Sequence, residues 1–241
     1  MTSINFDKVI DDYLSSERKR THRKRNIKIF YPSELTFPCL RGQYLKYTQP
    51  EIPVSPKTQR IFKIGTIIHD FIQDSFKKAN IEFSLRDLEA SIQGVYSANG
   101  DPIRIRGRAD AIIERNGEEY IIEIKSIKPQ PYKDDVFRFL NEPKEGHLKQ
   151  ILWYMQAANI KKGVIIYIEK VGAETKTFTI SLDDYSTQQS ITETAKKLYK
   201  HLKTGTSPPR EKDHWNNKIC NYCQYYEACE NDNLVANEPE N

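Results

Sequence analysis

The sequence lacks any long apolar run. No segment approaches the roughly 18 consecutive apolar residues that a membrane-spanning helix requires. The N-terminal segment, MTSINFDKVIDDYLSSERKR, also lacks the apolar core of a signal peptide. We therefore expect a cytoplasmic protein that makes no use of a membrane.

Internal repeats and long low-complexity linkers are also missing from the 241 residues. A chain of this length can bury one full-sized core and carry a small appended element, whereas two large independent domains would be difficult to accommodate. These absences predict one compact unit with additional segments at its ends.

The chain has little excess charge, since its formal net charge is only +4. The total therefore does not by itself indicate nucleic-acid binding. Basic residues are concentrated in ERKRTHRKRNIK at 17–28, which suits contacts with phosphates but equally suits a solvated arm. We expect a basic N-terminal arm or helix at 1–30 and an acidic, frayed tail at 231–241.

Hydrophobic periodicity predicts the main helices and strands. Apolar residues recur at helical spacing from 57 to 80, which predicts a helix with one buried face. A short helix is expected to begin within 31–47. Further helices are expected at 145–159 and at 181–205, the latter ending at Gly205, and strands at 163–170 and 175–182.

The clearest hairpin spans residues 103–126. Two β-rich runs, IRIRGRADAIIE and EYIIEIKSI, flank Asn116-Gly117, a dipeptide that favours a two-residue type I′ turn. Strands mixed with helices indicate an α/β or α+β fold. The hairpin makes the central sheet mixed rather than purely parallel.

The turn fixes which residues of the hairpin face each other. With Asn116-Gly117 in the turn, Asp110 lies directly opposite Glu123, and Lys125 shares their face. An ordinary solvated strand face is the alternative interpretation. Two opposed carboxylates without a partner are destabilising, however, and a divalent cation would remove that conflict.

Carboxylates suit Mg²⁺ or Mn²⁺, ions that bind a phosphate oxygen, activate water and stabilise a leaving oxygen. The backbone carbonyl of Ile124 is a further candidate ligand. Lys125 is a candidate for orienting the attacking water or for neutralising charge on the phosphate.

Other candidate residues lie outside the hairpin. His69 is on the preceding helix, and Gln150 and Tyr154 are four residues apart on one helical face. Four cysteines in a cytosolic chain favour metal or cluster ligation over disulfides; they are Cys39, Cys220, Cys223 and Cys229. Their spacing alone leaves both zinc and an iron–sulfur cluster open.

The segment that ends at Asp110, followed by Glu123-Ile-Lys125, resembles the signature of the PD-(D/E)xK nuclease superfamily, with Ala109 where the first residue of the pattern is often Pro. In RecB-like members a His placed like His69 is a metal ligand. In those nucleases a Gln-x-x-x-Tyr motif, which Gln150 and Tyr154 resemble, supports the site and contacts DNA.

The order of these motifs and the cysteines is similar to that of RecB-like exonucleases with a four-cysteine 4Fe–4S cluster. It is most similar to the CRISPR-associated exonuclease family known as the fourth Cas protein. AddB-type helicase-nucleases share the cysteine arrangement, but this chain is too short to hold their helicase.

The resemblance implies a restriction-endonuclease-like nuclease domain at 31–205, then a cysteine element at 206–230 completed by Cys39. The implied activity is Mg²⁺- or Mn²⁺-dependent, 5′ to 3′ exonuclease action on single-stranded DNA ends. It would trim spacer precursors beside CRISPR integrase proteins. The alternatives are a stand-alone or virus-borne repair or recombination nuclease, and a non-catalytic iron–sulfur DNA-binding module.

The resemblance also assigns the site residues. The expected catalytic residues are Asp110, Glu123, Lys125, Gln150 and Tyr154. The expected ligands of the divalent ion are His69, Asp110, Glu123 and the carbonyl of Ile124. The expected cluster ligands are Cys39, Cys220, Cys223 and Cys229.

Overall fold

The computed structural model describes residues 5–17, 25–78, 82–127, 140–185, 191–210, 218–221 and 223–235. Within these ranges the helices are α1 (Phe6–Glu17), α2 (Pro32–Leu35), α3 (Leu40–Thr48), α4 (Pro56–Lys78), α5 (Glu145–Ala158), the short 3-10 helix η1 (Leu182–Tyr185), α6 (Ile191–Thr204), α7 (Lys218–Asn221) and α8 (Tyr226–Val235). The strands are β1 (Ile29–Phe30), β2 (Ser84–Ala98), β3 (Asp101–Arg115), β4 (Glu118–Ile127), β5 (Lys162–Glu169) and β6 (Thr175–Ser181). None of the helices in these ranges combines the length and apolar character needed to cross a membrane.

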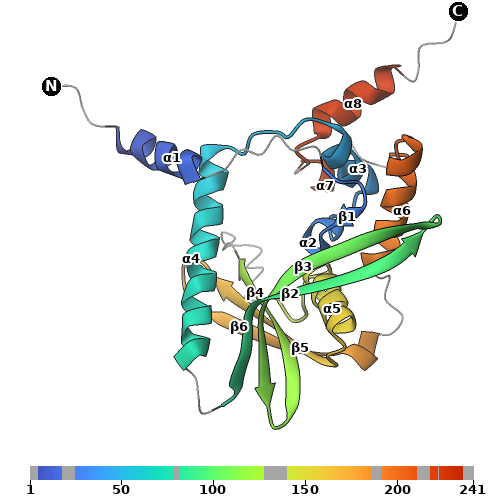
Figure 1. Ribbon diagram of the computed structural model, residues 1–241. Helices are drawn as coiled ribbons and strands as arrows, with labels where there is room; N and C mark the ends of the chain where they lie inside the picture. Colours follow the sequence, from blue (N-terminus) through green and yellow to red (C-terminus); the bar gives the residue numbers. More distant parts are fainter. Residues whose placement is uncertain are drawn as a thin grey trace, which may run out of the picture.

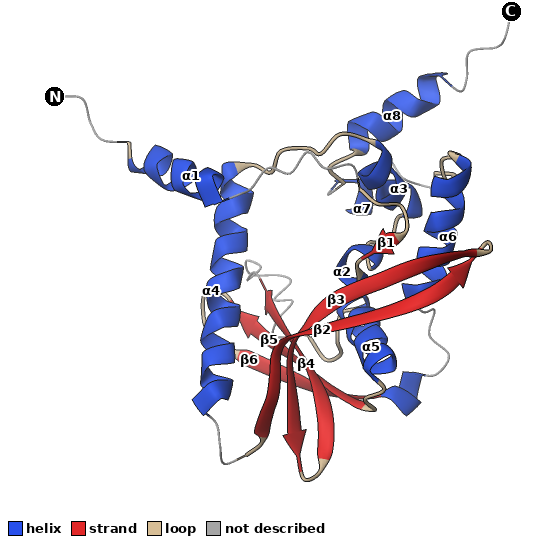
Figure 2. Ribbon diagram, viewed as in Figure 1, coloured by secondary structure: helices blue, strands red, loops and turns tan. Residues whose placement is uncertain are grey.

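The described strands form one six-stranded mixed sheet, in the order β1-β3-β4-β5-β6, with β2 paired to β3 outside this path. The pairs β2–β3, β3–β4 and β5–β6 are antiparallel, whereas β1–β3 and β4–β5 are parallel. Helix α4 runs along one side of this assembly, and α5 and α6 pack on the other side of the sheet (Figures 1 and 2). The predicted mixed α/β fold with flanking helices is confirmed.

Two apolar cores enclose strand β4. Ile121, on one face, belongs to the larger core shared with α5 and α6. Ile122 and Ile124, on the other face, belong to a smaller core with Ile72 of α4. A strand buried on both faces reads as a nearly continuous apolar run, which explains the sequence IIEI.

Strand β3 has an open stretch on one edge. Because β2 pairs along most of β3, β1 and β4 must share its other edge. On that edge β1 pairs at 104–105 and β4 pairs at 111–115, so within the described chain 106–110 have a strand partner only on the β2 side. Opposite the end of this stretch, Glu89 of β2 has a positive φ of 51°, and the β2–β3 ribbon bends there (Figure 1).

The predicted hairpin register is confirmed. Arg115 pairs with Glu118, and the ladder continues in register to Ala111 and Ile122. Asn116 and Gly117 have φ values of 54° and 78°, as a type I′ turn requires at both central positions.

Helix α4 differs from the prediction of a single buried face. Ile64 and Phe71 belong to the apolar pattern that predicted the helix at 57–80 but are 47% and 68% exposed, whereas Ile72 of the same pattern is buried. At 100° per residue, Ile64 and Phe71 lie on the side of α4 opposite His69, which faces the sheet. The apolar pattern of α4 is therefore wider than the surface that the sheet covers.

Other differences concern element bounds. The single helix expected at 181–205 is instead η1 and then α6, which ends before Gly205 with φ 71°; residues 186–190 lie outside the described ranges. The long strand β2 was not predicted. Helix α8 continues to Val235, into the tail that was expected to fray. Much of the basic stretch, 18–24, and the tail end, 236–241, also lie outside the described residues.

Candidate active site

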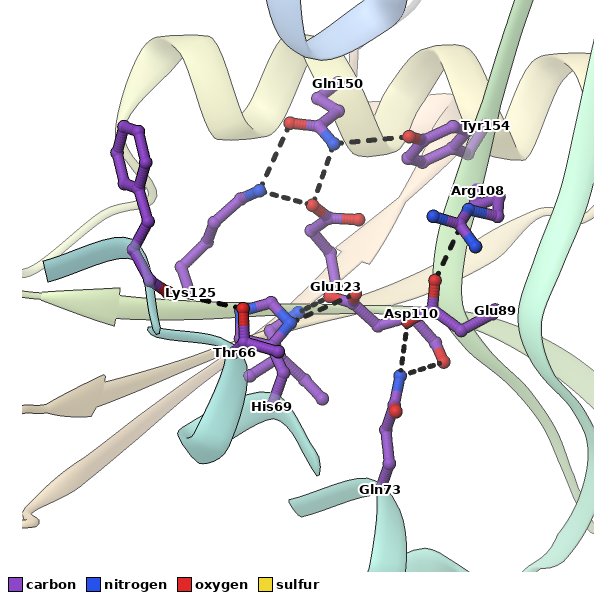
Figure 3. Close-up of polar contacts among 12 residues, drawn as sticks. Thr66, His69, Gln73, Glu89, Arg108, Asp110, Glu123, Lys125, Gln150 and Tyr154 are labelled. Atoms are coloured by element: carbon purple, nitrogen blue, oxygen red, sulfur yellow. Dashed lines mark hydrogen bonds and ion pairs between the residues drawn. The ribbon is translucent and has the colours of Figure 1, made fainter. Parts of the chain in front are cut away.

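The open stretch of β3 borders a pocket that collects most of the predicted site residues. Its lining comes from α2, α4, β2, β3, β4 and α5, and Figure 3 shows the polar side chains that meet there. The predicted residues found there are His69, Asp110, Glu123, Lys125, Gln150 and Tyr154.

Asp110 lies where β3 and β4 separate. The β3–β4 ladder ends at the pair Ala111–Ile122, and the same register places Asp110 opposite Glu123 at the next position. Asp110 Oδ2 accepts a hydrogen bond from the backbone N–H of Ile124 at 2.5 Å, and Oδ1 lies 3.2 Å from His69 Nδ1. Because the N–H and C=O of one strand residue point to the same side, the carbonyl of Ile124 also faces this gap.

Glu123 is held by residues of β4 and α5. Its Oε1 accepts from Lys125 Nζ at 2.5 Å and from Gln150 Nε2 at 2.8 Å. Gln150 Oε1 accepts from Lys125 Nζ at 3.3 Å, and Gln150 Nε2 lies 3.3 Å from the Tyr154 hydroxyl (Figure 3). The Gln and Tyr four residues apart therefore act on one network around Glu123.

Burial and neighbouring charges shift the pKa values of Glu123 and His69 in the pocket. Glu123 is only 2% exposed. Burial raises the pKa of its carboxyl; Lys125 lowers that pKa and the charge of Asp110 raises it. The hydrogen bond to Asp110 raises the pKa of His69 against the opposing effect of burial.

The pocket residues fit a divalent cation. Glu123 Oε2 is buried and has no hydrogen-bond partner among the described residues. A buried oxygen left in this way costs about 1–3 kcal/mol, and more when charged, which a bound cation would relieve. Across the described chain, no three His, Cys, Asp or Glu side chains stand close enough to hold an ion without adjustment. The carboxylate and carbonyl oxygens of the donor set are nevertheless the ligands that such an ion prefers, and the imidazole of His69 lies beside them.

Several lining residues were not predicted. They include Tyr31, Glu89, Arg106 and Arg108. Gln73 of α4 donates to Glu89 Oε1 at 2.8 Å and to the backbone oxygen of Asp110 at 3.0 Å, and so ties the helix to the bend. The alternation of arginines before Asp110 was the sequence signal for part of this set.

The four cysteines line a second, separate cavity. Cys39 precedes α3, and its Sγ accepts from the N–H of Gly42 at 3.3 Å. None of the four forms a disulfide in the described chain. Burial raises the pKa of Cys223, and the nearby Cys39 and Cys229 raise it further. Arg41 and Arg210 line the same cavity.

Solved structures share parts of this architecture. The crystal structure of SSO0001 is similar with a TM-score of 0.61 at 20% identity, over 93% of this chain and 95% of that one. An alkaline exonuclease from Laribacter hongkongensis, LHK-Exo, has a TM-score of 0.48 at 13% identity, over 74% of this chain and 90% of that one. None of the curated proteins matches this chain.

The family is shown by the sequence itself. The profile of the PD-(D/E)XK nuclease superfamily matches residues 68–230. That range includes the pocket residues from His69 to Tyr154 and the three C-terminal cysteines. The chain therefore belongs to the PD-(D/E)XK nuclease superfamily.

Proposed function

We propose that this nuclease is a Mg²⁺- or Mn²⁺-dependent exonuclease that degrades single-stranded DNA ends in the 5′ to 3′ direction. One observation carries the proposal: Asp110 and Glu123 meet where β3 and β4 separate, and one buried oxygen of Glu123 lacks a partner among the described residues. An opposed pair of carboxylates in an accessible pocket is suited to a cation that also binds phosphate.

His69, Asp110, Glu123 and the carbonyl of Ile124 would hold the divalent ion. When bound, the ion supplies positive charge at the phosphate and lowers the pKa of water. Lys125 is fixed by Glu123 and Gln150 with its ammonium in the pocket. There it orients the attacking water or neutralises charge on the phosphate. Gln150 and Tyr154 keep Glu123 in place.

Action on single-stranded ends and its polarity rest on the resemblance to RecB-like exonucleases. The same resemblance supports trimming of spacer precursors beside CRISPR integrase proteins. The pocket residues suit a stand-alone or virus-borne repair or recombination nuclease equally well. We retain 31–205 as the nuclease domain, flanked by the arm at 1–30, the cysteine element at 206–230 and the tail at 231–241.

We also propose that Cys39, Cys220, Cys223 and Cys229 bind a 4Fe–4S cluster. Their shared cavity, with two arginines in its lining, supports a site for an anionic group. A single zinc ion, at about 2.3 Å from each sulfur, would draw the thiolates into close mutual contact. A cluster binds each thiolate to a different iron and accepts wider spacing between the four sulfurs.

The nuclease proposal is tested with 5′- and 3′-end-labelled single-stranded DNA and Mn²⁺. Asp110→Asn and Lys125→Ala should each lower the cleavage rate by about 100-fold or more, because they remove charge that acts on the phosphate. Asp87→Asn, an exposed carboxylate of β2, is the matched control and should cleave like wild type. Chelation of the metal should stop cleavage.

Equal degradation by wild type, Asp110→Asn and Lys125→Ala would reject the assigned site. No cleavage by wild type, with DNA binding retained, would favour the non-catalytic module. The order of product release from the two labels decides the polarity.

The cluster proposal is tested by visible absorption of anaerobically purified protein. Wild type should be brown, and Cys223→Ser should lose the colour and much thermal stability, because a ligand is removed. Tyr226 lines the same cavity without supplying a ligand, so the control variant Tyr226→Phe should stay brown. Colourless wild-type protein that contains zinc would overturn the cluster.

A further inference from the structure

The β2–β3 ribbon carries a row of arginines that leads to the candidate active site. Arg104, Arg106 and Arg108 are exposed and alternate with more buried positions of β3, so they share one face of the strand. Asp110 is the next position of the same parity. Arg106 and Arg108 line the pocket together with Asp110.

The neighbouring row on β2 is uncharged. The register partners of the three arginines are exposed residues without charge, namely Val95, Gln93 and Ser91. This face of the ribbon therefore has one cationic row beside one neutral row. Two such rows side by side suit a polymer that has anionic groups along one side and flat, uncharged groups along the other.

Two of the three arginines in the row, Arg104 and Arg106, form no ion pair with a described acid. Arg106 donates to the Tyr31 hydroxyl at 2.9 Å and lies 5.4 Å from the centre of that ring, so its described partner is uncharged. Arg108 forms an ion pair with Glu89 at 3.5 Å, and 69% of its side chain remains exposed. No described acid forms an ion pair with Arg104.

Arginines of the same ribbon beyond the bend behave differently. Arg86 forms an ion pair with Glu114, and Arg115 forms one with Glu82 at 3.3 Å. Both are exposed, as the row residues are, with 55% and 56% of the side chain accessible. Arg104 and Arg106 thus differ from both, and positive charge without a described acidic partner lies on the part of the ribbon that leads to Asp110.

We propose that Arg104, Arg106 and Arg108 form a binding track for one DNA strand, with its phosphates on the arginine row and its bases over the neutral row of β2. Alternate residues of a strand are about 6.7 Å apart. This spacing is similar to that of consecutive phosphates on one nucleic-acid strand. Tyr31, beside Arg106, offers a ring on which a base can stack.

The neutral row favours a single strand over a duplex, because only an unpaired strand has bases that are free to lie on it. The track guides the strand along β3 toward Asp110, where the carboxylates stand. This inference rests on the proposed nuclease function. Its test measures DNA binding without cleavage, so the track can be rejected independently of the nuclease activity.

The test measures binding without cleavage. A labelled single-stranded oligonucleotide of about 12 nucleotides, within the usual range of such sites, is titrated with protein in EDTA at several salt concentrations. The Arg104→Gln/Arg106→Gln protein should bind more weakly. Its slope of log K against log salt should fall by about 1.4, since each phosphate contact on a single strand contributes about 0.7.

The matched control is Arg86→Gln/Arg115→Gln, which removes the same charge from the same ribbon beyond the bend. It should keep the wild-type slope. An unchanged slope in the track variant, or an equal loss in the control, would overturn the track.

Different results would reject the nuclease site and the arginine track. Wild-type protein that binds single strands through the track but cleaves none with Mn²⁺ would reject the nuclease site and retain the track. Cleavage that depends on Asp110, together with an unchanged salt slope in the track variant, would reject the track alone.

Discussion

Glu123 depends on a small set of neighbours for its position. One of its oxygens accepts from Lys125 and Gln150, and the other has no hydrogen-bond partner among the described residues. Gln150 contributes through two atoms, because its nitrogen donates to Glu123 and its oxygen accepts from Lys125. We therefore regard Gln150 as the residue that sets the direction of both charged groups.

Replacing Gln150 with Met keeps much of the volume and removes both polar contacts. We expect the cleavage rate to fall about 10- to 100-fold, the usual effect of losing a partner of a metal ligand. Tyr154→Phe removes only the hydroxyl next to Gln150 and should have a smaller effect. Steady-state cleavage with Mn²⁺ measures both. A larger loss in Tyr154→Phe than in Gln150→Met would contradict this order.

At the scale of elements, the hairpin β3–β4 and helix α4 hold the two sides of the site. The turn at Asn116-Gly117 sets the register that places Asp110 opposite Glu123. Helix α4 brings His69 to Asp110 and Gln73 to the bend. Replacing the glycine of the turn, Gly117, and the glycine of α4, Gly65, should change the stability of the protein in opposite directions.

Gly117→Ala should destabilise the protein by about 1 kcal/mol, because a side chain at φ 78° is strained. Gly65→Ala should stabilise it by up to about 1 kcal/mol, because alanine favours the helix and the added methyl would meet Ser126 Oγ only at 3.5 Å. In thermal unfolding, each change corresponds to a shift of about 2–4 °C. Shifts of the same sign in the two variants would contradict this assignment.

At the scale of the whole molecule, Asp101 joins segments far apart in the chain. Its carboxylate accepts from Lys203 at 2.5 Å and Tyr199 at 2.8 Å, both on α6, and from Lys28 at 3.0 Å. These hydrogen bonds hold the pKa of Asp101 well below its usual range. The network connects the start of β3 to α6 and to the segment before β1.

A carboxyl group whose pKa is lower in the folded than in the unfolded protein stabilises the fold at pH values above its unfolded pKa, which is about 3.9 for Asp. This stabilisation is lost as the pH falls through the folded pKa. Asp101→Asn should therefore unfold at lower temperature than wild type at neutral pH. The difference should narrow only below about pH 4. Unfolding temperatures across this pH range test it, and a difference that stays constant into strong acid would refute the linkage.

Local patterns predicted a large part of the fold. The Asn116-Gly117 turn and the alternation around it were enough to derive the register of β3 and β4, because both depend on neighbouring residues. Helix α4 and strand β5 followed from periodicity for the same reason. The buried face of α4 was predicted incorrectly at Ile64 and Phe71, since periodicity does not tell how much of a helix the sheet covers.

The sequence by itself therefore determined the hairpin, its opposed carboxylates and the family. Only the tertiary structure decided that β1 and β4 share one edge of β3 and leave 106–110 open between them. It also brought Cys39 to the C-terminal cysteines and Gln150 to Glu123. The physical reason is that turn and strand patterns act between neighbours in the chain, whereas open edges and shared pockets arise from packing distant segments together.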